Sequence, residues 1–288
     1  MTKVLSHPDL VWFESGQSAI GGDLVGLYKA LDRRFVELGR SLKVKEFSFP
    51  SFIELEDLKR IDYLHSFPHL ATFPVSLDSS EANIAEFRRE VIDAEKNTIK
   101  LTKLSPVHVI LTPAACYHFY IRFKKQTLNE PLYLTTRCTC FRHEDYYVPL
   151  ERQWNFSMRE IVCIGSMTEV QNFVDTMKIK VNQLLSDIHL NLQWETASDP
   201  FFDPSNNPKA LMQKLQPNKV EMLYQNRLAI GSVNSHRNYF GEAYEISRNG
   251  EPAYSACVAF GVDRWIAAFL HEYGTLRRDW PIDCAELT

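Results

Sequence analysis

Two neighbouring segments of the chain could bring an arginine, two carboxylates and an aromatic ring onto one face of a β-hairpin. Residues 132–144 and 155–164 are strand-like, and the polar residues 145–154 join them. Because side chains two positions apart share a face of a strand, each segment presents one alternating set. These sets are Cys138, Cys140, Arg142 and Glu144 in the first segment, and Phe156, Met158, Glu160 and Val162 in the second.

The residue types of this hairpin suit recognition of a nucleotide. The arginine could neutralise a phosphate, the ring could stack on a planar base, and a carboxylate could accept a hydrogen bond from an exocyclic amine. A second arginine, Arg264, follows Gly261 at a strand-to-helix junction, where the backbone can come close to a ligand. An ordinary charged hairpin and an ordinary junction show the same patterns, so neither feature is specific alone.

The composition is that of a globular protein with one large domain or two modest ones. The 288 residues are 45% hydrophobic, and the net charge of −4 argues against a large sequence-independent nucleic-acid footprint. Six cysteines in a chain of this length do not indicate a disulfide framework. No apolar run approaches the roughly 20 residues that span a bilayer, and the first ten residues lack the apolar core of a secretory signal. We therefore expect a soluble, cytoplasmic protein without membrane association.

The hydrophobic periodicity predicts an α+β domain. Helices are expected over residues 23–42, 81–104, 166–188 and 208–215 and between Gly261 and Gly274. The third of them begins at a Ser166–Glu169 capping box. Strands are expected over residues 46–53, 132–144, 155–164, 221–247 and 253–260. Adjacent strands with hairpin-like connections favour a mostly antiparallel sheet, and no linker divides the chain, so residues 1–288 are expected to form a single domain.

Together these segments resemble the class II aminoacyl-tRNA synthetases. FRHE, the loop after it and FSMREIV (residues 141–162) resemble motif two of that class, and ACVAFGVDRW (residues 256–265) resembles motif three. EFSFPSFI (residues 46–53) is similar to the weaker motif one, which builds the dimer interface. Within the class, the chain most resembles the amino acid:[carrier protein] ligases, a branch close to atypical seryl-tRNA synthetases. Supporting segments are residues 66–70, 111–117, 198–202 and 232–242.

The resemblance implies a fold and an activity. The fold is a six- or seven-stranded, mostly antiparallel sheet flanked by helices, usually in a homodimer. The activity has two steps: ATP and an amino acid form an aminoacyl-adenylate, and the aminoacyl group then passes to the phosphopantetheine thiol of an acyl carrier protein. A small amino acid, glycine or alanine, is expected in this branch, and the sequence does not define which one.

The motif matches imply roles for individual residues of this chain. Arg142 would hold the α-phosphate and the substrate carboxylate, and Glu144 would read the adenine amine. Phe156 and Arg264 would stack on the two faces of adenine, with Arg264 also reaching the γ-phosphate. Arg142 and Arg264 are thus the candidate catalytic residues, and Ser232 completes the candidate ATP site. The chain has no glycine-rich P-loop motif, which agrees with ATP held by arginines.

Members of this branch bind zinc through two cysteines and a glutamate. Cys116, Glu160 and Cys257 occupy the matching positions. Two thiolates and a carboxylate leave one tetrahedral position open for the amine of the substrate. The spacing of the three residues alone would favour three unconnected buried residues. The other four cysteines are interpreted as structural.

The resemblance leaves two parts of the site less well defined. Synthetases of this class commonly carry a magnesium-binding glutamate a few residues before the serine that matches Ser232, and Ala229 and its neighbours here include none. A magnesium ion would then need another carboxylate. Arg152, in the motif-two loop, is assigned no role beyond closeness to the triphosphate. Candidate walls of the amino acid pocket are Met158, Phe201, Asn234 and His236.

Net charge and domain organisation favour a carrier protein over tRNA as the acceptor. No tRNA-binding domain is recognisable beside the catalytic motifs, and the chain is slightly acidic. An acidic carrier protein needs only a modest basic patch. The candidate docking residues are Lys209, Lys214 and Lys219, with Lys178 and Lys180 in addition, although ordinary solvated lysines are the simpler interpretation of each.

Two other functions stay open on the sequence. A related ligase could pass the adenylate to a small amine or to tRNA with the same site residues. A non-catalytic, synthetase-like binding subunit is slightly favoured by the departure at Ala229 and opposed by the intact set of arginines.

Overall fold

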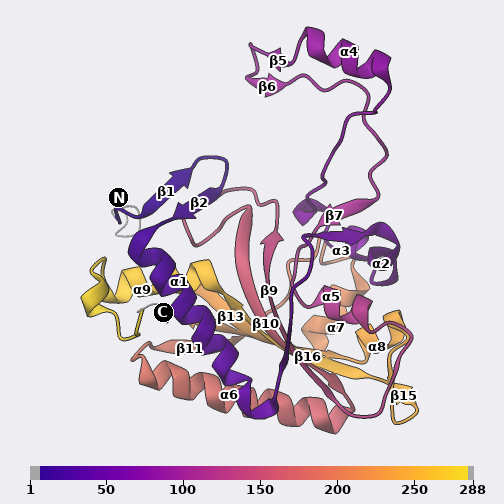
Figure 1. Ribbon diagram of the computed structural model, residues 1–288. Helices are drawn as coiled ribbons and strands as arrows, with labels where there is room; N and C mark the ends of the chain where they lie inside the picture. Colours follow the sequence, from indigo (N-terminus) through magenta and orange to yellow (C-terminus); the bar gives the residue numbers. More distant parts are fainter. Residues whose placement is uncertain (1–6, 285–288) are drawn as a thin grey trace.

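The computed structural model describes residues 7–284, so both ends of the expected domain, residues 1–6 and 285–288, lie outside the described residues. Its centre is a seven-stranded sheet (Figure 1). All neighbouring strands are antiparallel except the pair β3 and β9, as the sequence predicts for a mostly antiparallel sheet. In spatial order the strands are β11 (Leu192–Thr196), β12 (Lys219–Tyr224), β13 (Leu228–Arg237), β16 (Tyr254–Gly261), β10 (Asn155–Gly165), β9 (Leu132–Phe141) and β3 (Lys45–Phe47).

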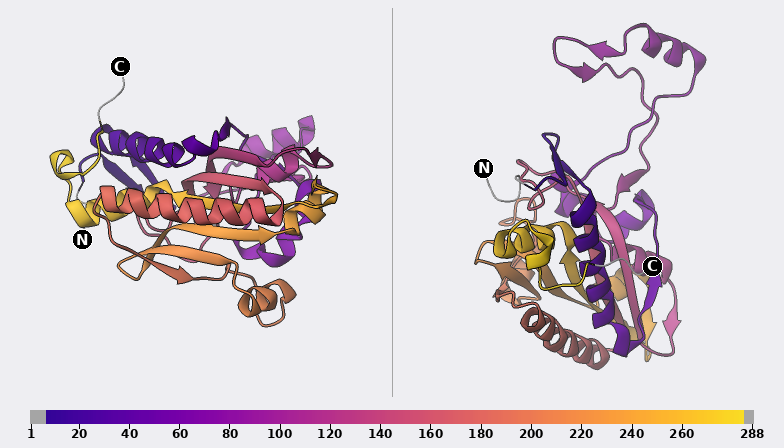
Figure 2. Two further views of the ribbon diagram at one scale, coloured as in Figure 1. Left: turned by 90° about the horizontal axis from the view of Figure 1, so that it is seen from below. Right: turned by 60° about the vertical axis from the view of Figure 1, so that its left-hand side comes forward.

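Three helices cover one face of the sheet and enclose the main hydrophobic core, and Figure 2 shows two of them, α1 and α6, side by side. They are α1 (Gly22–Leu38), α6 (Met167–Asp187) and α9 (Val262–Tyr273). On β10, Ile161 and Cys163 are buried beneath these helices, whereas Glu160 and Val162 face the other side of the sheet. This alternation follows from the two-residue period of a strand. It leaves every second residue of the central strands available to a site on the opposite face.

Short helices and loops surround that opposite face. A second buried cluster lies beneath them and includes Phe119, Tyr120 and Tyr244. The helices are α2 (Leu55–Arg60), α3 (Tyr63–Ser66), α5 (Tyr117–Arg122), α7 (Pro208–Leu215) and α8 (Tyr239–Tyr244). The minor strands are β1 (Leu10–Phe13), β2 (Gln17–Ile20), β4 (Phe52–Glu54), β7 (Val109–Leu111), β8 (Thr127–Leu128), β14 (Ser247–Arg248) and β15 (Glu251–Pro252). The 3₁₀ turns are η2 (Arg40–Leu42), η3 (Pro68–Leu70) and η4 (Arg277–Asp279).

The prediction of one helix over residues 81–104 is wrong beyond Arg89. Helix α4 (Glu81–Arg89) is followed by the short strands β5 (Ile92–Asp93) and β6 (Thr98–Ile99). The whole segment extends away from the body of the molecule (Figure 1), so the apolar side chain of Ile92 is exposed instead of packed on a core. Asn97 has a positive φ of 51°, a turn conformation that no helix contains.

Other predicted boundaries also shift. Strand β9 ends at Phe141, so Arg142 and Glu144 lie just beyond the strand. Residues 239–244, predicted as strand, form α8, in which a Cβ on Gly241 would come within 2.1 Å of the backbone of Ala253. The predicted boundaries of α7 and α9 are confirmed to within a residue or two.

A buried ion pair ties α1 to the central strands. Asp32 of α1 accepts hydrogen bonds from Nε and Nη2 of Arg159 at 2.8 and 2.9 Å, and from Nη1 of Arg137 at 2.8 Å. Arg159, which is 3% exposed, also donates to Glu46 of β3 at 2.7 Å. The pair thus joins α1, β9, β10 and β3 at one point beneath the site. The sequence analysis did not identify it.

Replacing Asp32 by alanine is expected to lower the free energy of unfolding by about 3–5 kcal/mol, because it leaves the buried Arg159 guanidinium without its main partner. Urea denaturation measures the effect. The double variant D32L/R159M should recover part of the loss, since it removes the buried charge as well. A single-variant loss below about 1 kcal/mol would contradict the prediction.

Helix α6 begins at the predicted capping box, which is confirmed: Ser166 Oγ accepts from the amide of Glu169, and Glu169 accepts from the amide of Ser166. Arg248 and the two Ser166 contacts lower the pKa of Glu169 to about 2. The stabilisation is therefore complete above the ordinary glutamate pKa and is lost as the pH falls from about 4.5 towards 2. The E169Q variant keeps the cap but not the charge. We expect it to reduce the difference in the free energy of unfolding between high and low pH by roughly 1 kcal/mol, the scale of a partly exposed ion pair. Urea unfolding at about pH 6 and about pH 3 checks it, and equal pH dependence in both proteins would exclude it.

Candidate functional site

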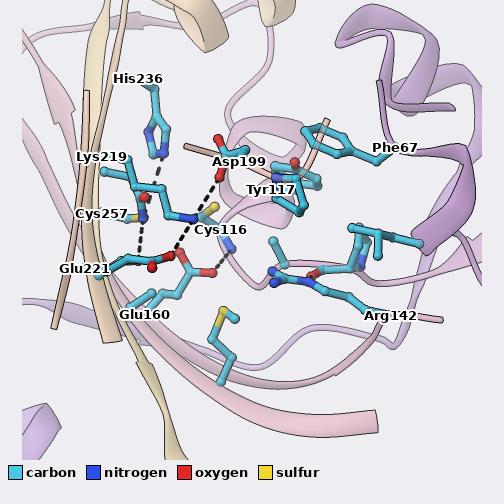
Figure 3. Close-up of a pocket in the computed structure, with 18 of the residues that line it drawn as sticks. Phe67, Cys116, Tyr117, Arg142, Glu160, Asp199, Lys219, Glu221, His236 and Cys257 are labelled. Atoms are coloured by element: carbon cyan, nitrogen blue, oxygen red, sulfur yellow. Dashed lines mark hydrogen bonds and ion pairs between the residues drawn. The ribbon is translucent and has the colours of Figure 1, made fainter. Parts of the chain in front are cut away.

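A cavity of about 580 Å³ lies on the face of the sheet that the long helices leave open. Strands β10, β13 and β16 form its floor, and α3, α7, α8 and the start of α5 form its rim. Figure 3 shows Arg142 reaching into it from one side while Cys257 and His236 approach from the other. All of the candidate ATP-binding and metal-binding residues from the sequence line this cavity; they are Cys116, Arg142, Glu144, Phe156, Glu160, Ser232, Cys257 and Arg264.

Arg142 is held at the end of β9 by its backbone and its side chain. Its amide donates to the carbonyl of Trp154 at 2.8 Å, and its Nε donates to the carbonyl of Pro113 at 2.9 Å. Its guanidinium carbon lies 5.3 Å from the ring centroid of Phe156, which the strand register places opposite Cys140. The guanidinium and the ring are therefore presented together, as the sequence analysis expected of a nucleotide site.

Arg264 enters the same cavity from the first turn of α9. Its Nε donates to the carbonyl of Glu151 at 2.7 Å and its Nη1 to the carbonyl of Ala229 at 2.8 Å. Burial lowers the pKa of the Arg264 guanidinium, and the positive charges of Arg142 and Arg152 lower it further. Arginine remains a cation even so. Guanidinium groups from distant parts of the chain thus repel one another in one cavity, which favours an anionic ligand between them.

The motif-two loop is an ordered hairpin that places Arg152. Arg152 donates to Glu144 at 2.5 Å, and its guanidinium carbon lies 4.5 Å from the centroid of Tyr146. Glu144, the predicted adenine reader, is therefore paired with a cation from its own loop. Glu151 in the same loop forms a double hydrogen bond with Arg227 at 2.6 and 3.0 Å, which fixes the loop against the end of β13.

Two thiols and an imidazole gather at the other end of the cavity. The ligand atoms of Cys116, His236 and Cys257 all lie within 4.8 Å of one another. Cys116 is at the start of α5, His236 is on β13 and Cys257 is on β16. The contact with Cys257 raises the pKa of the Cys116 thiol, and burial and the Glu160 carboxylate raise it further. A nearby cation would reverse this effect by stabilising the thiolates.

Glu160 lies beside the thiols, and only one of its two carboxylate oxygens accepts hydrogen bonds from the described residues. Its Oε1 accepts from the amides of Ala115 and Cys116 at 3.0 and 3.2 Å. Its Oε2 is buried and has no hydrogen-bond partner among the described residues. A buried carboxylate oxygen without a partner is costly, and a cation bound beside the thiols would relieve that cost. Two thiols, a carboxylate and an imidazole are the ligand types that zinc prefers, and the residues present fit that ion.

His236 was predicted only as a wall of the amino acid pocket, and the structure places it within the metal-ligand cluster. Its Nε2 lies 3.8 Å from Cys257 Sγ. Its Nδ1 lies 3.1 Å from the hydroxyl of Tyr120 and 3.2 Å from that of Ser255. Burial lowers the pKa of His236 to about 4, so the ring is neutral at pH 7 and has a lone pair to offer.

The other predicted pocket residues line the same cavity. Asn234 donates to Ser232 Oγ at 3.0 Å and to Cys257 Sγ at 3.3 Å, which links Ser232 to the thiol cluster. Phe201 stacks on Phe67 with ring centroids 4.9 Å apart, and Met158 lies on the floor.

Lys219, predicted as a docking residue, lies in the wall of the cavity and is paired with acidic residues there. Its ammonium lies 3.0 Å from Asp199 and 3.0 Å from Glu221 in the cavity (Figure 3). Burial raises the pKa of Asp199, but Lys219 outweighs it and holds that pKa below its usual value. Lys209 also turns inward, to the carbonyl of Ile61 at 3.0 Å. Sequence alone showed three lysines near one helix, and only Lys214 of these is exposed.

Strand pairing places a carboxylate near Ala229, where this sequence lacks the glutamate that synthetases of this class commonly carry. The carbonyl of Ala229 accepts from Arg264, so this position contributes backbone to the site. Glu221 on β12 stands directly opposite Ser232 on β13. Residues opposite each other share a face of the sheet, so Glu221 is the carboxylate next to Ser232. The sequence analysis required such a group without identifying it.

The fold and the site define a class of protein, and comparison with known families agrees. Residues 100–273 match the model of the tRNA synthetase class II core domain (G, H, P, S and T). The chain belongs to the class II tRNA synthetase core family. The resemblance to that class, and the expected fold, are confirmed.

Within the family, the chain is similar to amino acid–[acyl-carrier-protein] ligases. It is 34% identical to ligase 1 of Bradyrhizobium diazoefficiens over 88% of this chain and 80% of the relative. It is 33% identical to ligase 2 of the same organism over 97% and 85%. The type-2 serine–tRNA ligase of Methanocaldococcus jannaschii is 25% identical over 89% of this chain, which spans only 53% of that relative.

A solved structure shows the same fold. The M. kandleri seryl-tRNA synthetase, crystallised with A. aeolicus tRNASec, superposes with a TM-score of 0.82 at 20% identity. The match covers 98% of this chain and 59% of that chain.

None of the helices in residues 7–284 combines the length and the hydrophobicity that crossing a bilayer requires.

Proposed function

We propose that this chain is a ligase that activates a small amino acid, glycine or alanine, with ATP and transfers it to the phosphopantetheine thiol of an acyl carrier protein. The observation that carries the proposal is that Arg142, Phe156 and Arg264 line the same cavity as the thiols of Cys116 and Cys257. A nucleotide site and a site for an amine in one cavity would hold both substrates for reaction. The similarity to two amino acid–[acyl-carrier-protein] ligases supports this acceptor.

In the first step, a carboxylate oxygen of the amino acid forms a bond to the α-phosphorus of ATP, and the bond to pyrophosphate breaks. Arg142 would neutralise the α-phosphate and orient the attacking carboxylate. Phe156, beneath that guanidinium, would carry the adenine ring. Arg264 is already anchored by two backbone carbonyls, so it would hold its charge in place with little reorganisation during the reaction.

The amine of the substrate would lie at the opposite end of the cavity. Cys116, Cys257 and Glu160 would hold a zinc ion there. When bound, zinc would supply a Lewis acid with affinity for a free amine. Residues around the ligands orient them: the amide of Ala115 holds Glu160, and the Asn234 side chain donates to Cys257. Amino acids whose α-amine is blocked would then be poor substrates.

Magnesium would bind at the nucleotide end, as expected for a class II core. Ser232 would supply a hydroxyl, and Glu221, opposite it on β12, would supply the carboxylate that is missing at Ala229. Because Lys219 lies 3.0 Å from Glu221, occupancy by the ion would need this lysine to pair with Asp199 alone. An oxygen-only set with few protein ligands is typical of magnesium on a nucleotide.

In the second step, the thiolate of the carrier protein attacks the acyl carbon, the bond from that carbon to the AMP oxygen breaks, and AMP leaves. Helix α7 stands at the mouth of the cavity, because Pro208, Lys209 and Met212 line it. The outer side of α7 presents Lys214 between the exposed Leu211 and Leu215. A basic residue among apolar ones suits an acidic carrier protein. Homodimer formation and a cytoplasmic location stay predictions.

Two measurements with the purified protein test the proposal. The first is pyrophosphate exchange into ATP in the presence of glycine, alanine, serine or no amino acid. The second is mass spectrometry of a carrier protein after incubation with ATP and the amino acid, in its phosphopantetheinylated form and, as the control, in its unmodified form. We expect exchange with a small amino acid and an aminoacyl adduct on the phosphopantetheinylated form alone.

Other outcomes select another function. If exchange occurs, no carrier protein is loaded and tRNA is aminoacylated, then tRNA is the acceptor. The assignment of the active-site residues would stay the same. Absence of both exchange and ATP binding in zinc-loaded protein would overturn the proposal and favour a non-catalytic binding subunit.

A further inference from the structure

The metal end of the cavity holds one more protein ligand than amine capture requires. Cys116, Cys257 and Glu160 leave one position of a tetrahedral ion open. The imidazole of His236 lies within 4.8 Å of both thiols and could fill that position. If it stayed there, the ion would have four protein ligands, which is the pattern of a structural site without reactivity. The ion keeps four ligands in both arrangements only if one ligand leaves as the other binds.

The surroundings of His236 prepare it to bind a metal through Nε2. The hydroxyls of Tyr120 and Ser255 lie 3.1 and 3.2 Å from its Nδ1. When a hydroxyl oxygen accepts the Nδ1 proton, the ring has the tautomer whose Nε2 lone pair is free. A metal-binding histidine is usually held in this way through its other ring nitrogen. The Nε2 atom points to Cys257, 3.8 Å from its sulfur.

The backbone at His236 departs from the regular pairing of its two strands. Strands β13 and β16 pair regularly as far as Ser235, and the register then shifts before Arg237, so His236 is the extra residue of a β-bulge. Bulges disrupt the ladder locally and are found where a side chain must be re-aimed. Glu160, by contrast, is fixed by two backbone amides, and Cys257 lies within the regular ladder.

We propose that His236 is a displaceable fourth ligand of the zinc ion, bound through Nε2 when no amino acid is present and replaced by the α-amine of the substrate. The proposal rests on the zinc site of the proposed function and adds a ligand to it. The imidazole nitrogen leaves the ion as the amine nitrogen binds, so the number of ligands stays at four. Between turnovers, His236 would thus keep the ion in the site.

X-ray absorption at the zinc edge of the wild-type protein tests the proposal without any variant. We expect imidazole scattering together with two sulfurs in the amino-acid-free protein. On addition of glycine and a non-hydrolysable ATP analogue, we expect the imidazole signal to disappear while both sulfurs remain. Zinc with two sulfurs but no imidazole before glycine would overturn the proposal, as would imidazole scattering that persists afterwards. Protein that binds no zinc would instead contradict the underlying metal site.

A variant gives an independent readout. In H236A, loss of zinc to a chelator without amino acid should be about 10-fold to 100-fold faster, the range seen when groups that support a metal are removed. With glycine and the ATP analogue bound, wild type and H236A should lose zinc at similar rates, because the amine then holds the position. H118Q is the matched control, since His118 is also buried but contacts Thr112 outside the cluster. Equal rates for wild type and H236A without amino acid would overturn the proposal.

Discussion

Replacing Arg142 by alanine is expected to lower amino-acid-dependent pyrophosphate exchange by about 10³-fold or more, which is the usual cost of removing an arginine that stabilises phosphoryl transfer. The side chain reaches into the cavity from the side opposite Cys257 and His236 (Figure 3). Its loss removes charge from the α-phosphate and leaves the substrate carboxylate without an orienting partner. The measurement is kcat/KM for exchange with saturating zinc.

Controls separate this effect from loss of structure. Lysine at position 142 should restore little activity, because a point charge cannot hold a phosphate and a carboxylate in the planar, two-pronged geometry of a guanidinium. Arg122, whose guanidinium lies over Phe123 and outside the cavity, is the matched control, and R122A should keep wild-type exchange. Exchange in R142A within about tenfold of wild type would remove Arg142 from the reaction, since that corresponds to only about 1.4 kcal/mol.

The parts of the fold that could be predicted depend on local patterns. The strand-like composition of residues 155–164 correctly identified the strand that carries Phe156 and Glu160, because aromatic and β-branched residues such as those in this run favour strands. The Ser166–Glu169 capping box marked the start of α6 because its hydrogen bonds lie within four residues. The motif matches then indicated that Cys116 and Cys257 belong to one zinc site. The spacing of the two residues in the sequence does not indicate this.

The parts that were missed depend on distant contacts. Lys219 has the sequence context of a surface lysine, and its burial follows from Asp199 and Glu221, which only the folded chain brings to it. His236 joins the thiols because β13 pairs with β16, and the sequence does not show which strands pair. Apolar residues such as Ile92 led to the prediction of a helix over residues 81–104, and Ile92 is exposed in the structure. Periodicity alone does not show whether another element covers the apolar residues.

Replacing Cys257 by serine is expected to reduce bound zinc well below about one ion per chain, because a serine hydroxyl does not ionise to a ligand as a thiol does. Amino acid binding should weaken far more than ATP binding, since in the proposed function Cys257 holds the ion that binds the amine and Arg264 holds the nucleotide, and both residues line the same cavity. Elemental analysis measures the metal, and calorimetric titrations with glycine and with ATP measure the two affinities.

The matched control for this experiment is C138S. Cys138 is also buried on the site side of the sheet, but it contacts Thr136 and does not belong to the cluster. C138S should keep both its zinc and its affinity for glycine. If C257S retained full zinc stoichiometry, Cys257 would not be a ligand. If both variants lost zinc equally, the loss would reflect a general loosening of the sheet, so only the difference between them assigns the ion to Cys257.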